Sequence, residues 1–293
     1  MLVKAMDDLS SFLPRQRDVR RRFDRIAADF DEADVVHRLT GDGLLERLQP
    51  MQLEARRILE LGAATGTLSR QLSRHFRRSQ IVSVDLSLPM LREARRHRGW
   101  FSRVRELQAS AEQLPLADDS ADVVVANQLL PWLGPSPAGL KEVARVLRPE
   151  GLFAFASLGP DSFRELRAAF EDGDAHVHSF ADMHDVGDAL VRAGLRDPVL
   201  DVDRLELSYR DTQSLYRDLR RCGGNTLTGR RQSLTGKERF RRADKALDDS
   251  RQQGSIRISL ELVYGHAWGA KVSQTAGEFR VDVADLRGRR RQR

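Results

Sequence analysis

The sequence predicts an α/β fold of the doubly wound class, with a mainly parallel sheet covered by helices on both faces. Five apolar runs alternate with helical patterns between about residues 56 and 157, in the order that such a sheet requires. The run 58–61 ends in a glycine-bearing turn, and the run 81–85 ends in a carboxylate about 20 residues later. This spacing is typical of a nucleoside-binding sheet, in which the acidic residue accepts the ribose hydroxyls.

The elements of the predicted core follow in chain order. Residues 15–49 carry apolar side chains at helical spacing, and we expect these helices to break near Thr40-Gly41-Asp42-Gly43. The pattern then predicts a helix over 67–76, a strand over 121–127, a helix over 140–147, a helix stop at 148–151 and a fifth strand over 152–157.

The second half of the chain predicts a helical insertion between the last two strands. The elements expected are a helix over 162–170, a polar loop over 171–179, a helix over 182–193 that ends at Gly194, a strand over 199–209, a helix over 211–221 with an aspartate cap, and a final strand over 256–268. About 45 residues separate the last two strands, which is long for a connection that covers nothing.

We therefore divide the chain into four parts. Residues 1–49 are interpreted as a helical segment that covers the cofactor site, and 50–210 with 255–270 as the sheet-bearing core. Residues 211–254 are interpreted as a helical lid over the carboxyl ends of the strands, where ligands bind in open α/β sheets. Residues 271–293 are interpreted as a basic, solvated C-terminal tail.

The glycine-bearing turn favours S-adenosylmethionine over a dinucleotide. A pyrophosphate site needs the three glycines of G-x-G-x-x-G, whereas Gly62 and Gly66 stand four residues apart with Ala64 between them. The carboxylate of Glu60 would repel a pyrophosphate, but it suits a ligand that carries an ammonium and a sulfonium group. Because alanine has a Cβ, we expect the loop to avoid positive φ at Ala64.

Composition narrows the classes of function. The chain has 293 residues, of which 40% are hydrophobic, enough for one large domain or one domain with an insertion. We expect no membrane span, because no apolar run has the required length, and no signal peptide. The single cysteine, Cys222, excludes an internal disulfide, suits the cytoplasm and is expected to be a packed residue. His176 and His178 are too weak a pattern for a metal site, so none is expected.

The positive charge has three competing explanations, which are genome composition, nucleic-acid binding and the steering of an acidic protein partner. The net charge is +6 and the pI about 9.9, with arginine supplying most of the excess. The chain has no basic segment interleaved with aromatic residues and no recognised nucleic-acid motif, so we expect no nucleic-acid partner. A basic face could instead steer an acidic protein toward the site.

Several segments resemble those of known methyltransferases. Residues 58–66 are similar to the glycine motif of class I methyltransferases, and 109–116 resemble the loop that flanks the adenine in that superfamily. Within it, the chain resembles the malonyl-acyl-carrier-protein O-methyltransferase family over roughly 19–270. The segments that carry this closer resemblance are 22–31, 127–132, 155–166, 214–225 and 262–267.

The resemblance implies a cofactor, a set of residues and a reaction. The cofactor would be S-adenosylmethionine. The residues implied to bind it are Phe30, Glu60, Gly62, Ala64, Gly66, Asp85, Leu86, Ala111, Glu112 and Asn127. Phe30 stands where the family generally has tyrosine, so any role that needs a phenol hydroxyl is lost. The methyl group would pass to the free carboxylate of malonyl-acyl carrier protein or malonyl-CoA, which gives the methyl ester that primes pimeloyl synthesis for biotin.

This reaction needs a cation more than a base. A malonyl carboxylate is already ionised at pH 7, so no general base is expected. A bidentate arginine is the natural group to orient it. Arg217 and Arg220 lie three residues apart on one face of the predicted helix 211–221, and Arg217 falls in a matched segment. The partner implied is an acidic acyl carrier protein that carries a malonyl group.

Two other functions stay open. A related mitochondrial family has a similar body and lid, and it assembles respiratory complex I through arginine hydroxylation. A second alternative is a degenerate protein that binds the cofactor without catalysis, for which the alanine at position 64 is the only support.

Overall fold

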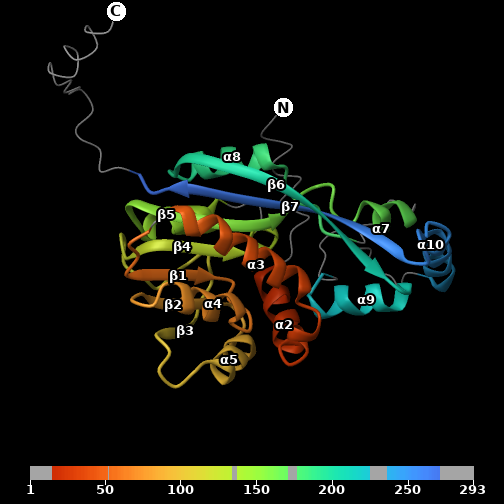
Figure 1. Cartoon of the computed structure of the whole chain (residues 1–293), viewed down its shortest axis with the longest axis horizontal. Coiled ribbons are helices and arrows are strands. Elements are labelled where there is room, and N and C mark those ends of the chain that lie inside the picture. The colour runs from red at the N-terminus through yellow and green to blue at the C-terminus, as the bar shows by residue number, and fades with distance from the viewer. Residues whose placement is uncertain (1–14, 52, 134–136, 171–176, 225–235, 271–293) are drawn as a thin grey trace, which may run out of the picture.

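Seven strands form one sheet with the order β3-β2-β1-β4-β5-β7-β6 (Figure 1). The computed structural model describes residues 15–51, 53–133, 137–170, 177–224 and 236–270. Strands β1 to β5 pair in parallel, and β7 runs antiparallel to both β5 and β6. The strands are β1 (Arg57–Leu61), β2 (Gln80–Asp85), β3 (Val104–Gln108), β4 (Ala121–Asn127), β5 (Leu147–Leu158), β6 (Arg196–Tyr209) and β7 (Ile256–Trp268). The predicted fold class is confirmed.

Helices cover both faces of this sheet. The described helices are α2 (Gln16–Ile26), η1 (Phe30–Glu32), α3 (Val35–Leu48), η2 (Gln49–Met51), α4 (Thr67–His75), α5 (Leu88–His97), η3 (Leu130–Trp132), α6 (Ala138–Val146), α7 (Arg164–Ala169), α8 (Met183–Arg192), α9 (Thr212–Arg221) and α10 (Lys237–Asp249). Leu44 of α3 and Leu72 of α4 belong to one buried apolar cluster, and Val143 of α6 and Leu190 of α8 belong to a second. The sheet is therefore the middle layer of three.

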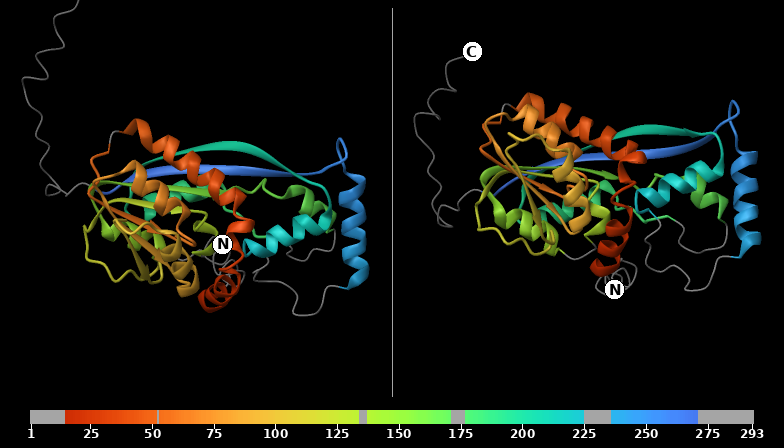
Figure 2. Two further views of the ribbon diagram at one scale, coloured as in Figure 1. Left: turned by 60° about the horizontal axis from the view of Figure 1, so that its bottom comes forward. Right: turned by 90° about the horizontal axis from the view of Figure 1, so that it is seen from below.

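The antiparallel pair β6–β7 extends beyond the parallel strands. β5 pairs with β7 as far as Leu158 opposite Leu262, whereas β6 and β7 continue to Tyr209 opposite Ile256. Figure 2 shows this pair running on toward α9 and α10, which belong to the insertion between the two strands. The insertion thus lies on the carboxyl side of the sheet, and its work as a lid stays a prediction.

The expected helix break at residues 40–43 is wrong, because α3 runs through it without interruption. Gly41 and Gly43 are both buried within this helix. A Cβ on Gly43 would overlap the hydroxyl group of Tyr264, so this glycine allows the helix to approach β7 closely. Glycine marks a close contact here and not the end of a helix.

The expected helix stop at 148–151 is confirmed, because α6 ends at Val146, but these residues also lie in β5, which begins at Leu147 and not at the expected position 152. The pairing of β4 with β5 jumps from Ala121 opposite Leu147 to Val123 opposite Leu152, so the extra residues form an irregularity. Pro149 is tolerated at such a place because no regular ladder bond is lost. β6 begins three residues earlier than expected, at Arg196 and not at position 199.

The caps predicted for two helices are confirmed. Gly194 has φ 96° after α8, and the Leu195 amide closes the helix end by donating to the Leu190 carbonyl at 3.1 Å. Asp211 accepts from the Ser214 amide at 2.7 Å and so caps α9.

The two glycines of α3 give opposite expectations for stability. Gly41→Ala should raise the free energy of unfolding by up to about 1 kcal/mol, because its Cβ would meet its nearest atoms at 3.5 Å and alanine favours a helix. Gly43→Ala should lower it by about 1–3 kcal/mol through overlap with Tyr264. Urea unfolding of the pair measures both changes, and two changes of the same sign would contradict the close-contact explanation.

Candidate functional site

The turn after β1 has three residues in the left-handed region. Gly62 has φ 72° and Gly66 has φ 76°, which explains glycine at both positions. Ala64 has φ 45°, so the expectation that the loop avoids positive φ there is wrong. The left-handed conformation costs alanine about 1–2 kcal/mol, and the hydrogen bond from its amide to Asp85 Oδ2 at 2.8 Å offsets part of this cost.

Asp85 ends β2 beside this turn. Its carboxylate accepts from the amides of Ala64 and Ser87, both at 2.8 Å. Burial raises the pKa of Asp85 to about 6, although these amides act in the opposite direction. The carboxylate is therefore fixed in position and partly protonated near pH 6.

A first cavity opens at this carboxyl edge of the sheet. It is lined by the N-terminal segment, the glycine turn, the ends of β2 and β4, and residues 109–112. The predicted cofactor residues in its lining are Phe30, Gly62, Ala64, Asp85, Leu86, Ala111, Glu112 and Asn127. Glu60 and Gly66 lie outside the lining. The structure thus brings most of the predicted set to one place, from five separate parts of the chain.

Glu60 lies beneath the glycine turn and not in the cavity. It is 2% exposed, and its carboxylate accepts from the Ser69 hydroxyl. Burial raises the pKa of Glu60 to about 8, and the nearby Asp85 adds to the shift. Because Glu60 lies beneath the turn, a cation in the first cavity above it would favour its ionised form.

The N-terminal segment closes the outer side of the first cavity. Phe30 is 2% exposed, and Phe23 packs edge-on against Trp132 with ring centroids 5.0 Å apart. Gln16 donates to the side chain of Ser110 on the opposite wall. The enclosed volume is about 90 Å³, whereas small-molecule sites usually enclose about 300–1,000 Å³. The N-terminal segment therefore leaves a smaller space than such sites usually have.

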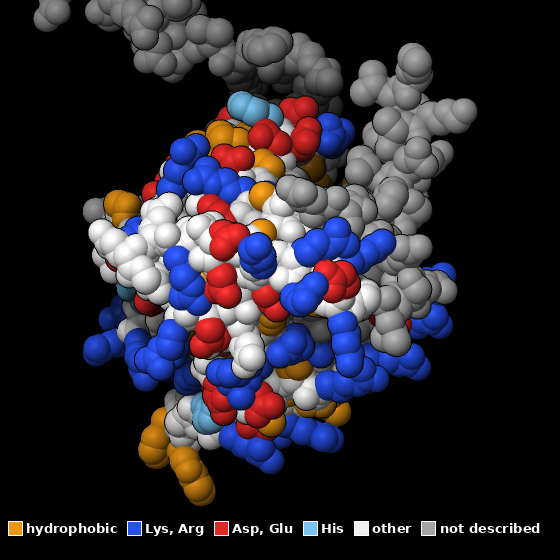
Figure 3. Space-filling model, turned by 90° about the vertical axis from the view of Figure 1, so that its right-hand side faces the viewer, with side chains coloured by type: hydrophobic (Ala, Val, Ile, Leu, Met, Phe, Trp, Pro, Cys, Tyr) orange, Lys and Arg blue, Asp and Glu red, His pale blue; other side chains and the backbone are white. Residues whose placement is uncertain are grey.

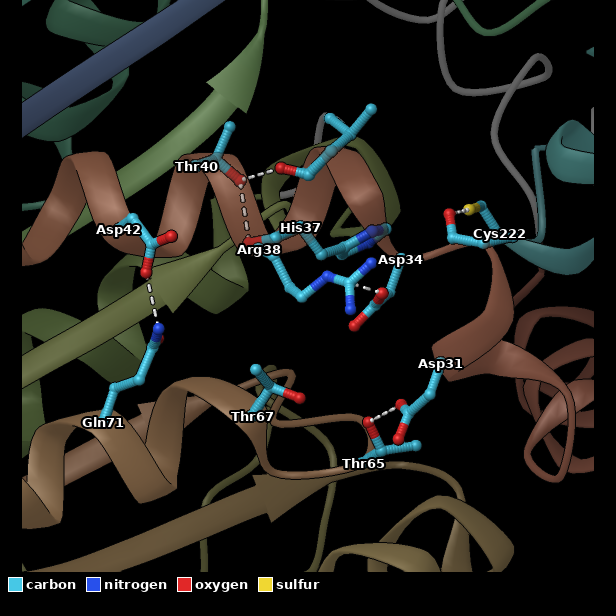
Figure 4. A network of polar contacts seen from close by, with 12 residues as sticks. Asp31, Asp34, His37, Arg38, Thr40, Asp42, Thr65, Thr67, Gln71 and Cys222 are labelled. Carbon is cyan, nitrogen blue, oxygen red and sulfur yellow. Dashed lines mark hydrogen bonds and ion pairs between the residues drawn. The ribbon is translucent and has the colours of Figure 1, made fainter.

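A network of polar contacts joins this segment to the glycine turn (Figure 4). Asp31 accepts from the Thr65 hydroxyl, and Asp34 forms an ion pair of 3.0 Å with Arg38. Figure 4 shows the side chain of Asp31 directed at the turn that carries Thr65. Together with Asp85, these aspartates place negative charge around the cavity, which suits a cationic ligand.

The end of β4 holds α3 over the same edge. Asn127 Nδ2 donates to the His37 carbonyl at 2.7 Å, and Asn127 Oδ1 accepts from the Thr40 hydroxyl at 2.7 Å. Both ends of this side-chain amide are thus bonded to α3. Asn127 was predicted as a cofactor residue, and the structure shows that it also positions the wall of the cavity.

A second cavity of about 260 Å³ adjoins the first. The two share three lining residues, His37, Gln128 and Trp132. The other walls come from the start of α3, the ends of β5 and β6, residues 178–180 and the inner face of α9. Among the described lining residues there is no arginine or lysine. The cavity is mostly apolar, and the shared residues lie between it and the first.

Three nitrogen atoms around the second cavity are buried without a hydrogen-bond partner in the described structure. They are His37 Nδ1, Gln128 Nε2 and His178 Nε2. Burial lowers the pKa of both histidines to about 4, so both are neutral at pH 7. Sequence reasoning missed His37 and Gln128, because no motif marks them and only the fold brings them together.

The predicted substrate residues Arg217 and Arg220 lie elsewhere. Both are exposed on α9, and neither lines a described cavity. The face of α9 that lines the second cavity carries Asp218, Leu219 and Cys222. The prediction that either arginine orients a substrate carboxylate stays a prediction.

Cys222 is a packed residue, as expected. Its thiol donates to the Ala33 carbonyl at 2.7 Å, and burial raises its pKa to about 12, so it stays protonated. His176, Asn225 and the tail 271–293 lie outside the described residues. Within the described part, no three histidine, cysteine, aspartate or glutamate residues come together as metal ligands. None of the described helices is long and apolar enough to cross a membrane.

The residues of the first cavity have the chemical groups that the predicted cofactor requires. Asp85 can accept from two ribose hydroxyls, because an ionised carboxylate has free lone pairs after two amide bonds. Leu86 and Ala111 offer apolar surface for an adenine ring beside it. Gly62 and Ala64 present the backbone of the glycine turn, with Glu60 beneath it, to a methionine ammonium. The residues present are therefore those that such a ligand requires.

Comparisons with known proteins agree with this geometry. The Methyltransferase domain family matches residues 59–155. A malonyl-[acyl-carrier protein] O-methyltransferase from Halorhodospira halophila is 42% identical, over 94% of this chain and 97% of that protein. A protein of the same name from Laribacter hongkongensis is 41% identical, over 88% and 91%.

Solved structures share the fold at low identity. The YcgJ protein from Bacillus subtilis has a TM-score of 0.57 at 17% identity, covering 78% of this chain and 98% of that one. A phosphoethanolamine N-methyltransferase from Haemonchus contortus, solved with S-adenosylmethionine, has a TM-score of 0.53 at 15% identity, covering 86% and 60%.

The buried Glu60 should make stability depend on pH. Its pKa is about 8 in the folded protein and 4.5 for an ordinary glutamate, as in the unfolded chain. Folding therefore takes up a proton when the pH lies between these two pKa values. The free energy of unfolding should therefore fall as pH rises from about 5 to 8, by at most about 1.4 kcal/mol per pH unit from this group.

Glu60→Gln should remove this contribution and raise the melting temperature most at pH 8. The exposed Glu54→Gln is the matched control and should leave the slope unchanged. Thermal unfolding followed by circular dichroism from pH 5 to 8 measures the slopes. Parallel curves for Glu60→Gln and the original protein would show that Glu60 is not the group that titrates.

Proposed function

The chain belongs to the malonyl-[acyl-carrier protein] O-methyltransferase family, and we propose that it transfers a methyl group from S-adenosylmethionine to the free carboxylate of a malonyl thioester. The product is a methyl ester that primes pimeloyl synthesis for biotin. The observation that carries the proposal is the first cavity, where Asp85 and the glycine turn meet at one edge of the sheet. We propose that this reaction takes place in the cytoplasm.

The cofactor would lie in the first cavity. Asp85 would hold the ribose, the loop with Ala111 and Glu112 would flank the adenine, and the turn at Gly62 and Ala64 would face the methionine moiety. S-adenosylmethionine supplies an electrophilic methyl group on a positively charged sulfur. The Asp85 carboxylate favours that charge electrostatically, and Glu60 does so once the cation has shifted it to its ionised form.

The residues around the junction of the cavities provide alignment and exclude water. A malonyl carboxylate is ionised at pH 7, so the protein need not remove a proton. Phe30, Trp132 and Leu129 line the first cavity with apolar surface. Catalysis then rests on holding the acceptor oxygen in line with the methyl group in a site that excludes water.

The carrier protein would dock beside α9 and α10. Figure 3 shows Lys and Arg side chains spread over the face that carries these helices. The exposed cations of α9 and α10 are Arg217, Arg220, Lys237, Arg241, Arg242 and Lys245. An acidic carrier would be steered to this face, next to the helix that lines the second cavity.

One assay tests the function. Purified protein is incubated with labelled S-adenosylmethionine and malonyl-acyl carrier protein, and we expect label in a base-labile ester on the malonyl group. An arginine hydroxylase would leave this substrate unlabelled, and so would a protein that only binds the cofactor. Succinyl-acyl carrier protein tests the acceptor length in parallel. Absence of labelled malonyl ester would overturn the proposal.

Asp85 should set the cofactor affinity and its pH dependence. Asp85→Asn should weaken S-adenosylmethionine binding by about 1–3 kcal/mol, roughly 5- to 150-fold, because the ribose hydroxyls lose an acceptor. Since the pKa of Asp85 is about 6, affinity in the original protein should fall as pH drops below 6, and the variant should lack this fall.

Calorimetry from pH 5 to 8 measures these affinities. Asp119→Asn, exposed on a loop outside both cavities, is the control. Equal affinity of Asp85→Asn and the original protein at pH 7.5 would refute the ribose contact.

The exposed arginines of α9 should act on the carrier. The double variant Arg217→Ala/Arg220→Ala should raise the KM for malonyl-acyl carrier protein about 3- to 10-fold, since each exposed charge contributes modestly. The KM for malonyl-pantetheine, which has the same carboxylate without a carrier, should change less than twofold. If both KM values rise together, these arginines hold the carboxylate, as the sequence analysis predicted.

A further inference from the structure

The second cavity contains an unusual set of polar groups for a site that would receive an anion. Its described lining has two neutral histidines, one glutamine, the phenol of Tyr209, the thiol of Cys222 and a single carboxyl group, Asp218. Burial raises the pKa of Asp218, whereas the nearby Arg217 and Arg221 act in the opposite direction. An anionic acceptor would therefore meet donors that carry no charge.

Gln128 lies at the junction of the two cavities, and its side-chain amide nitrogen is unpaired among the described residues. Its side chain is 7% exposed, its Nε2 has no partner among the described residues, and it lines both cavities. The backbone N–H of Gln128 donates to the Ala156 carbonyl at 2.8 Å, which fixes the position of this residue. Its φ is 55°, in the left-handed region. A buried donor without a partner costs free energy unless a ligand accepts a hydrogen bond from it.

His37 provides a second donor at the same junction. Its ring packs edge-on against Phe30 with centroids 5.0 Å apart, and its carbonyl is bonded to Asn127. Its Nδ1 has no partner among the described residues. His178 reaches the second cavity from another segment and packs against Trp132 with centroids 4.6 Å apart.

We propose that the second cavity is the acceptor site and that Gln128, with His37, holds the substrate carboxylate through uncharged N–H donors at the junction with the cofactor cavity. His178 lines only the second of the two cavities, and its ring would donate to the thioester carbonyl there. This proposal rests on the proposed function, because it takes a malonyl thioester as the substrate.

The chemistry favours uncharged donors over an arginine. The carboxylate oxygen forms a bond to the methyl carbon while the carbon–sulfur bond breaks and its electron pair stays on sulfur. No proton moves, and a negative and a positive charge disappear together. A cation fixed against the carboxylate would stabilise the reactants more than the transition state and so slow the reaction. Neutral donors orient the oxygen without this cost, and an apolar cavity favours loss of charge.

The first test removes or displaces the donor at position 128. Asparagine tolerates the left-handed backbone and withdraws the amide by one methylene group, so Gln128→Asn should fold. We expect kcat/KM for malonyl-pantetheine to fall 10- to 100-fold in Gln128→Asn and Gln128→Leu. Binding of malonyl-pantetheine to the complex with S-adenosylhomocysteine, measured by calorimetry, should weaken to a similar extent. Gln80→Leu, exposed at the far end of β2, is the matched control.

The second test uses pH. In Gln128→Glu the new carboxyl should repel the substrate when ionised and donate like the amide when protonated. With saturating cofactor, activity should recover at least 5-fold as pH falls from 8 to 6. The titratable groups that line the two cavities around position 128 are His37, His178, Asp85, Glu112, Asp218, Tyr209 and Cys222, and Gln128→Leu shares them all. Recovery should therefore be absent in Gln128→Leu.

The outcomes separate this proposal from the proposed function. If the original protein methylates the malonyl thioester while Gln128→Asn and Gln128→Leu keep its kcat/KM and binding, the assignment of Gln128 is overturned and the function stands. Equal pH profiles for Gln128→Glu and Gln128→Leu would also overturn it. If the original protein does not methylate the thioester, the function and this proposal fail together. His37→Phe should lose at least 10-fold in kcat/KM, and an unchanged value would remove His37 from the site.

Discussion

The position of α3 over the carboxyl edge of the sheet depends on one side-chain amide. Asn127 uses its nitrogen on the His37 carbonyl and its oxygen on the Thr40 hydroxyl, so the end of β4 and the start of α3 are held as one unit. Both bonds are part-buried, where an unpaired amide would cost about 1–3 kcal/mol. Because His37 and Gln128 flank this contact, the wall between the two cavities is built on it.

The elements that sequence reasoning predicted well are those with local causes. The strands and helices of the core follow from alternating apolar and helical patterns, and the caps at Asp211 and Gly194 follow from backbone chemistry near the cap itself. The predictions that were wrong depend on contacts with residues outside the local sequence. Gly43 is required by Tyr264, more than two hundred residues away, and no local pattern distinguishes that contact from a helix break. Ala64 keeps a positive φ with support from Asp85 on the next strand.

The same division applies to the candidate site. The acidic residue and the glycine turn of the cofactor cavity were predictable, because a parallel sheet brings the carboxyl ends of β1 and β2 together. The second cavity was not, since its walls come from the segment after β4, the ends of β5 and β6, the start of α3 and the inner face of α9. No motif predicts that these elements meet. Charge and a matched segment indicated Arg217, but neither shows which face of α9 lines the cavity, and that face carries Asp218 and Leu219.

The distribution of charge around the two cavities follows from the reaction. Glu60 and Asp85 lie beside the place of a cationic ligand, whereas the described lining of the second cavity has no lysine or arginine. The two reacting charges can then be each other's main partners, and both vanish in the transition state. A cation within the second cavity would compete with the sulfonium for the acceptor carboxylate. Arginines are instead exposed on the outer face of α9, where they can attract an acidic carrier without slowing the transfer.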